Sequence, residues 1–336
     1  MNHNIDIILF ISLFILTDAI SAKKFYKIHL LNEKHKSLVL NPTFFKTVDT
    51  PSYKLTKNIK VYDYIFQDDD HIDEFIKNKS IDLIRTDNDF VTCKKNELTE
   101  KYFNRYNIDQ THCKFLQNKQ ALRSYLSKFH EINNVKSKIF TNDKYIVQKL
   151  KRIEFDNFIV KPTCGAGSGG VFNLYRENND IINLDKFKDH RNDNIYIKDV
   201  CNTYIAEEFI GGSEHNLDLV IFKNEIYFWH ISDDSVDMQN FQDIQTIFPS
   251  SLKNEEQINM FEQAKFILKR LNILNGVYHF EFKYYKDKAY LIELNPRCPG
   301  GNYVEYISKL YGNDLEYDDM LIALDKNHTR MTWHLK

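Results

Sequence analysis

Two glutamates and an asparagine near the C-terminal end could bind a metal ion. Glu281 lies in one apolar segment, and Glu293 and Asn295 lie in the next. Residues two apart on a strand point to the same face of a sheet, so Glu293 and Asn295 share a face. If residues 286–288 form a three-residue turn between the two segments, Glu281 lies directly opposite Glu293.

Carboxylates that face each other across a sheet repel, and a cation removes that repulsion. The amide oxygen of Asn295 adds a neutral ligand, which completes the all-oxygen set that Mg²⁺ prefers together with nucleotide phosphates. The pattern therefore predicts a site for Mg²⁺, with Mn²⁺ as a substitute. The alternative is a hairpin whose polar face meets solvent. Tyr290 and Ile292, which we expect on the opposite, apolar face of the strand, argue against it.

A glycine-rich loop could bind phosphate. Four of the ten glycines of the chain lie within residues 165–170, directly after the apolar segment 158–161 and Pro162. Without a Cβ, successive backbone N–H groups can close around an oxyanion, and Ser168 adds a hydroxyl donor. Lys161 ends the apolar segment and would reach the α- and β-phosphates of a nucleotide. The alternative is a glycine-rich hairpin that binds no ligand.

The order of residues excludes two common phosphate loops. A Walker loop carries its lysine after the glycines and opens a helix, and a dinucleotide loop has no leading lysine. Here Lys161 comes first, and residues 171–175 alternate like a second strand. We therefore expect a hairpin flap that covers a nucleotide.

A second pair of glycines interrupts a strand. The segment 204–210 is followed by Gly211 and Gly212 and then by an alternating strand, 215–222. A strand that breaks in this way leaves backbone groups that can bind the edge of a purine. We expect the side chain of Glu207 to lie in solvent at this hinge.

Residues 118–129 read as a helix with Leu122, Tyr125, Leu126 and Phe129 on one face. Lys119 lies near its start, where it either reaches the nucleotide phosphates or stays in solvent.

The loop Lys-Pro-x-x-Gly-x-Gly-Ser-x-Gly-Val at 161–171, the hinge at 204–214 and the Glu-x-Asn-x-Arg segment at 293–297 together resemble the ATP-grasp superfamily. The resemblance covers residues 115–325. Within the superfamily, His-x-Glu at 279–281 and the segment 293–297 look most like carboxylate–amine ligases of the L-amino-acid ligase type. Those ligases commonly carry a further C-terminal segment, which often helps to close the acceptor pocket, whereas this sequence stops soon after residues 311–315. The resemblance therefore leaves the substrate open.

The resemblance assigns roles to individual residues. It implies that Glu208 gives its carbonyl to the adenine amino group, that Ile210 gives its N–H to a ring nitrogen, and that Glu214 accepts from the ribose hydroxyls. The full implied nucleotide set is Lys119, Lys161, Gly167, Ser168, Gly169, Glu208, Phe209, Ile210 and Glu214. The implied metal ligands are Glu281, Glu293 and Asn295, and the implied catalytic residues are Arg297 and Lys161.

The implied activity is ligation. ATP activates a carboxylate, such as an amino acid, as an acyl phosphate, and Arg297 stabilises the phosphoryl group while an amine attacks. The substrates would be a small carboxylate and a small amine. A carboxylase that uses bicarbonate and a non-catalytic ATP-binding protein remain as alternatives. The roles of His215, His230, Asp234 and His279 stay open.

Composition excludes several classes of protein. The net charge of −2 gives no field for nucleic acid, and five scattered cysteines without a Cys-x-x-Cys pair indicate reduced thiols in the cytoplasm. The apolar stretch 7–16 is too short to span a membrane, and no Lys or Arg precedes Lys23, which argues against a signal peptide. The sequence leaves a homodimer open.

The pattern of elements predicts three lobes with mixed α/β and α+β structure, an ATP-grasp fold preceded by a parallel α/β lobe. The lobes are an N-terminal α/β lobe (1–112), a small subdomain with the glycine loop (113–209) and a large subdomain with the metal site (210–336). In the first lobe we expect a parallel sheet with helices on its faces. Its predicted strands are 5–11, 37–40, 59–65 and 81–85, and its predicted helices run to about Lys27 and over 71–77 and 97–106.

Overall fold

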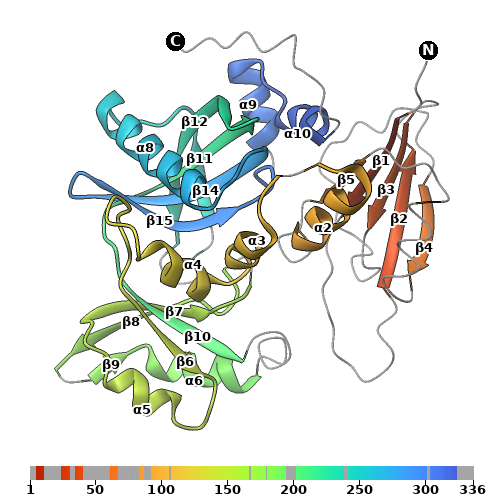
Figure 1. The fold of residues 1–336 in the computed structure, drawn as a ribbon. Coiled ribbons are helices and arrows are strands. Elements are labelled where there is room, and N and C mark those ends of the chain that lie inside the picture. Colours follow the sequence, from red (N-terminus) through yellow and green to blue (C-terminus); the bar gives the residue numbers. More distant parts are fainter. Residues whose placement is uncertain are drawn as a thin grey trace.

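The structure is a computed structural model. It describes residues 5–10, 24–30, 35–40, 61–66, 77, 83–86, 92–105, 107–165, 168–178, 180–193, 202–237, 241, 243–300 and 303–323. Three five-stranded sheets follow one another along this part of the chain (Figure 1). Gly167, Cys201, the helix predicted before Lys24 and all of the predicted helix 71–77 except Lys77 lie outside the described residues.

The first sheet contains β1 (Ile5–Phe10), β2 (Lys24–Leu30), β3 (His35–Leu40), β4 (Val61–Phe66) and β5 (Leu83–Thr86). Its strand order is β4-β2-β3-β1-β5. The predicted strands of this lobe are therefore confirmed to within about two residues at each end, and β2 is an additional strand.

The first sheet is mixed, so the prediction of a parallel sheet is only partly right. β1 pairs in parallel with β3 and β5, but β2 is antiparallel to both β3 and β4. Only residues 31–34 connect β2 to β3, and this link is too short for the crossover that parallel strands need. The helix predicted to run to Lys27 is wrong over 24–27, where β2 begins. α2 (Thr92–Phe103) packs on β5 and starts earlier than the predicted helix 97–106.

The second sheet is antiparallel and carries the glycine loop. It contains β6 (Ser137–Thr141), β7 (Asn157–Pro162), β8 (Phe172–Glu177), β9 (Asp180–Ile182) and β10 (Thr203–Glu208), in the order β6-β10-β7-β8-β9. The helices α5 (Ile146–Lys151) and α6 (Leu184–Asp193) belong to the same part of the chain. The loop joins β7 to β8 as an antiparallel hairpin, which confirms the predicted hairpin. Its role as a flap over a nucleotide stays a prediction.

The third sheet is also antiparallel. It contains β11 (Ser213–Phe222), β12 (Glu225–Val236), β13 (Asp243–Ile247), β14 (Gly276–Tyr285) and β15 (Lys288–Asn295), in the order β13-β12-β11-β14-β15. Three helices accompany it: α8 (Asn254–Arg270), α9 (Tyr303–Tyr311) and α10 (Leu315–Ala323).

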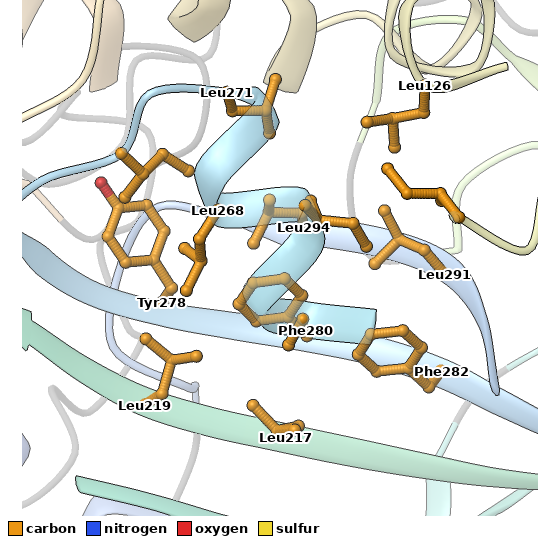
Figure 2. Close-up of a cluster of buried hydrophobic side chains, with 14 of the residues drawn as sticks. Leu126, Leu217, Leu219, Leu268, Leu271, Tyr278, Phe280, Phe282, Leu291 and Leu294 are labelled. Carbon is orange, nitrogen blue, oxygen red and sulfur yellow. The ribbon is translucent and has the colours of Figure 1, made fainter. Parts of the chain in front are cut away.

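One face of the third sheet is apolar and is covered by α8. Alternate residues of β11 and β14, such as Leu217, Leu219, Phe280 and Phe282, bury their side chains there against Leu268 (Figure 2). Because side chains alternate along a strand, the residues between them point to the opposite face. That opposite face carries the polar residues of the site.

Two short helices lie between the second and third sheets, α3 (Gln110–Leu116) and α4 (Lys119–Leu126) (Figure 1). Asn118 starts α4, because its side chain accepts a hydrogen bond from the N–H of Ala121 (3.0 Å). Leu122 and Leu126 pack in the core of the third sheet, although the predicted boundary at residue 113 groups them with the second. The division into lobes at 112 and 209 stays a prediction.

Candidate active site

Glu281 and Glu293 face each other on neighbouring strands, as predicted, but by a different route. The turn has two residues, since Tyr285 pairs with Lys288. Lys286 and Asp287 both have positive φ, 49° and 60°, which is typical of a two-residue hairpin turn. The predicted three-residue turn is therefore wrong. A β-bulge adds one residue to β15 and restores the pairing of Glu281 with Glu293.

The extra residue of the bulge is Ile292. A side chain opposite the polar face was predicted here, but Ile292 lines the same cavities as Glu281 and Glu293. A bulge redirects the side chain next to it, which accounts for the difference. The bulge also directs the carbonyl of Ile292 toward Arg123, whose Nη2 donates to it at 2.8 Å.

Polar side chains cross the third sheet in two rows on this face. Directly paired residues of β12, β11, β14 and β15 form each row, and residues two apart on one strand connect the rows. The first row is Ser232, Asn216, Glu281 and Glu293. The second row is His230, Asp218, His279 and Asn295. Asn295 donates to Glu281 at 3.3 Å, so all three predicted metal ligands lie together.

The two facing carboxylates titrate differently. Burial and the charge of Glu293 raise the pKa of Glu281 to about 7. Burial would also raise the pKa of Glu293, but the charges of Lys119 and Lys161 outweigh it and lower that pKa. Lys119 places its Nζ 3.0 Å from Glu293 and donates to the carbonyl of Gly165 at 3.0 Å. The lysines therefore compensate Glu293 more fully than Glu281, whose pKa stays raised.

Glu207 is buried and not in solvent, which corrects the prediction. Its carboxylate lies 2.6 Å from Nε of Arg123 and 2.8 Å from Nζ of Lys161. Burial would raise the pKa of Glu207, but these two cations hold it at about 2. Arg123 was missed, although it lies four residues after Lys119 and so shares its helix face.

The predicted nucleotide residues that the structure describes, which are all except Gly167, line one cavity of about 140 Å³ between the second and third sheets. Its lining includes Lys119, Lys161, Ser168, Gly169, Glu208, Phe209, Ile210 and Glu214. The side chain of Glu208 accepts from the N–H of Lys136 (3.1 Å), and Glu214 pairs with Lys283 at 2.8 Å. Ser168 donates to the carbonyl of Phe241, which ties the glycine loop to the third sheet's side of the cavity.

A second cavity of about 370 Å³ adjoins the first, and Arg297 lines it. His215, Asp234 and His279 line it as well. His230 does not line the cavity. It is buried, and its Nε2 lies 3.1 Å from Asp218. The two cavities share Ser168, Glu214, Glu281, Ile292 and Glu293.

His279 lies next to the metal-ligand candidates. Its Nδ1 is 2.7 Å from Asp218, and its Nε2 is 3.9 Å from Glu281. Burial would lower the pKa of His279, but the charge of Asp218 outweighs it and raises that pKa. Asp218 is fully buried, and contact with His279 and His230 outweighs the effect of burial and lowers its pKa.

Residues 154–305, which contain the glycine loop, the hinge and the hairpin of Glu281 and Glu293, match the ATP-grasp domain family. This part of the chain has the ATP-grasp fold. Solved structures with a similar fold support this fold assignment. The L-amino acid ligase from Bacillus licheniformis superposes with a TM-score of 0.61 at 18% identity, over 78% of this chain and 61% of that chain. The carboxyaminoimidazole ribonucleotide synthase from Aspergillus clavatus, complexed with ATP, gives 0.64 at 14% identity, over 80% and 66%.

Carnosine synthase 1 from Homo sapiens is 30% identical over 123 residues, which are 36% of this chain and 15% of that protein. The match thus spans a small part of the human protein, and the solved chains are covered to less than two thirds. The predicted ATP-grasp fold is confirmed by these comparisons. No helix among the described residues is long and apolar enough to cross a bilayer.

Proposed function

We propose that the protein is an ATP-dependent carboxylate–amine ligase. It activates a carboxylate as an acyl phosphate and joins it to an amine, with release of ADP and phosphate. The observation that carries the proposal is the position of Glu281 and Glu293, which line both cavities. A phosphoryl group can therefore pass from a nucleotide in the first cavity to a carboxylate in the second.

ATP would occupy the first cavity. Lys119 and Lys161 would neutralise its phosphates, with backbone N–H groups of the glycine loop around Ser168. The backbone of Glu208 and Ile210 would bind the adenine edge, and Glu214 the ribose. In support, these side chains come from two sheets and α4 and still line one cavity.

The donor set fits Mg²⁺. Glu281 and Glu293 are paired on neighbouring strands and Asn295 lies 3.3 Å from Glu281, so three oxygen-bearing side chains of the kind that Mg²⁺ prefers lie together. Glu281, Glu293 and Asn295 would hold Mg²⁺, which would offset the charge of the phosphate oxygens. In the part of the chain that the structure describes, no three His, Cys, Asp or Glu side chains form a metal cluster, so phosphate and water would supply the remaining ligands.

The reaction has two steps. A carboxylate oxygen of the substrate attacks the γ-phosphorus, and the bond to ADP breaks. The amine nitrogen then attacks the acyl carbon, phosphate leaves with the bonding electrons, and the amine loses a proton. Arg297 in the second cavity would stabilise the charge on the phosphoryl group and on the tetrahedral intermediate. The names of two relatives, carnosine synthase and L-amino acid ligase, favour an amino acid as one substrate.

The test is a screen for ADP and phosphate release from Mg-ATP with pools of amino acids and amines, followed by mass spectrometry of the products. We expect release that requires both a carboxylate and an amine, and a product with the mass of the two minus water. ADP release that depends on bicarbonate alone would instead favour a carboxylase. ATP binding without any acceptor-stimulated hydrolysis would indicate a non-catalytic protein.

A further inference from the structure

We propose that Arg123 is a positioning residue that frees Lys161 to bind the nucleotide phosphates, by keeping the charge of Glu207 compensated when Lys161 turns away. The proposal rests on the proposed function in one respect, that a nucleotide occupies the first cavity. It concerns Arg123, which does not itself line that cavity and would act only through Glu207 and the backbone of β15.

Three buried, charged side chains form this arrangement. Glu207 places one carboxylate oxygen 2.6 Å from Nε of Arg123 and the other 2.8 Å from Nζ of Lys161. The side chains of Arg123, Glu207 and Lys161 are only 5%, 4% and 7% exposed. Lys161 and Glu207 line the first cavity, whereas Arg123 does not. The lysine alone is therefore placed to exchange its carboxylate partner for a phosphate.

Whether Lys161 can exchange Glu207 for a phosphate depends on the charge that it leaves on Glu207. A buried carboxylate that loses its only cation is strongly destabilising, whereas a buried carboxylate with a second cation stays paired. When Lys161 moves to a phosphate, Arg123 remains on Glu207 and the pair stays neutral. Without Arg123, the same movement would leave Glu207 buried and unpaired. The free-energy cost of that state would lower the affinity for the nucleotide.

Arg123 also connects the three elements that surround the cavity. It belongs to α4, pairs with Glu207 on β10, and donates through Nη2 to the carbonyl of Ile292 on β15 at 2.8 Å. Ile292 is the extra residue of the bulge and lines the cavity itself. The planar guanidinium makes both contacts at once, through Nε and Nη2.

The experiment compares two variants that break the same ion pair. Affinity for a non-hydrolysable ATP analogue with Mg²⁺ and the urea midpoint of unfolding are measured for the parent, Arg123→Met, Glu207→Gln and the double variant. A purely structural role predicts that both single changes lower affinity alike, in proportion to lost stability. The proposal predicts that Arg123→Met lowers affinity and that Glu207→Gln does not.

We expect Arg123→Met to bind the analogue at least about tenfold more weakly, because Lys161 then has to leave an unpaired carboxylate. Glu207→Gln should bind as tightly as the parent or more tightly, since no carboxylate competes for Lys161, even though its midpoint falls. The double variant should return to within a few-fold of the parent. Arg123→Lys keeps the charge and should also stay within a few-fold.

The matched control is Arg270→Met, which removes another arginine that holds a carboxylate, Glu131, away from both cavities. It should lower the midpoint and leave affinity unchanged. Parental affinity in Arg123→Met, or equal losses in Arg123→Met and Glu207→Gln, would overturn the proposal. If Arg123→Met does not fold, weak binding by Glu207→Gln or by the double variant overturns it alone. A parent that does not bind the analogue contradicts the proposed function instead.

Discussion

Two groups of acids line the first cavity from the second and third sheets, and the chain compensates their charges to different degrees. Glu207 on β10 has two cations of the chain within 2.8 Å. Glu281 and Glu293 on the β14–β15 hairpin face each other, and Lys119 contacts only Glu293, at 3.0 Å. The pKa of Glu207 is therefore held at about 2, whereas that of Glu281 is raised to about 7.

We interpret the difference as one between a charge that stabilises the fold and a charge that is proposed to bind a metal ion. The acid on β10 is complete within the chain, so it contributes to the fold and to the position of Lys161. On the hairpin, Lys119 compensates Glu293, whereas Glu281 keeps a raised pKa, and a metal ion bound by the pair would add positive charge there. Changes on the two sides should therefore have different consequences, for stability on one side and for binding and turnover on the other.

The largest effect is expected in the second cavity, from Arg297→Ala. If Arg297 stabilises charge that develops on the transferred group, ligation should fall by about 10²- to 10³-fold, while Mg-ATP affinity stays within a few-fold. Arg297→Lys should recover little activity, because a point charge cannot replace a planar two-pronged contact. Steady-state kinetics and nucleotide titration measure the two quantities.

A matched control for Arg297 is Arg176→Ala. Arg176 lies on β8 and donates to the carbonyl of Lys151 at 3.0 Å, away from both cavities. This variant should ligate like the parent. An Arg297→Ala protein that ligates at the parental rate, or that fails to bind ATP, would move Arg297 from catalysis to structure.

The next effect concerns Glu207 and acid. Its pKa in the folded state, about 2, lies below the ordinary value of 4.5. The stabilisation is therefore present above pH 4.5 and is lost as the pH falls toward 2, and it amounts to something on the order of 3 kcal/mol. Urea unfolding between pH 6 and pH 2 should show this loss in the parent, and Glu207→Gln should lack it. An identical pH dependence in both proteins would contradict the pairing.

The smallest effect is expected from Glu281→Gln without metal and nucleotide. The change removes the repulsion from Glu293, so stability should stay the same or rise by about 0.2–1 kcal/mol. Urea unfolding near pH 7.5 in the presence of a chelator measures it. If Glu281→Gln lowers the free energy of unfolding as much as Glu207→Gln does, the distinction between Glu207 and the hairpin pair is contradicted.

The sequence predicted the parts of the site that depend on short segments. The order of Lys161 and the glycines sufficed for a hairpin flap, and strand alternation sufficed for a shared face of Glu293 and Asn295. The predicted contact of Glu281 with Glu293 was right although its turn was wrong, because a shorter turn and a bulge offset each other. A bulge has no local sequence signal here, so the position of Ile292 was missed.

The missed features depend on contacts between distant segments. Arg123 and Glu207 are 84 residues apart, and nothing in the sequence fixes how α4 meets β10. The antiparallel placement of β2 was missed because the segment before Lys24 read as a helix that continued. The second cavity takes its lining from several strands, so its preference for an amine or carboxylate could not be read from any one motif.

The central claim is that the hairpin pair is the metal site of a nucleotide-binding enzyme, and calorimetric titration of ATP with and without Mg²⁺ tests it most directly. The parent should bind Mg-ATP more tightly than metal-free ATP. Glu293→Gln should lose that gain by about tenfold or more, and by more than its change in the stability of the apo protein accounts for. Equal affinity with and without Mg²⁺, unchanged in Glu293→Gln, would contradict the account.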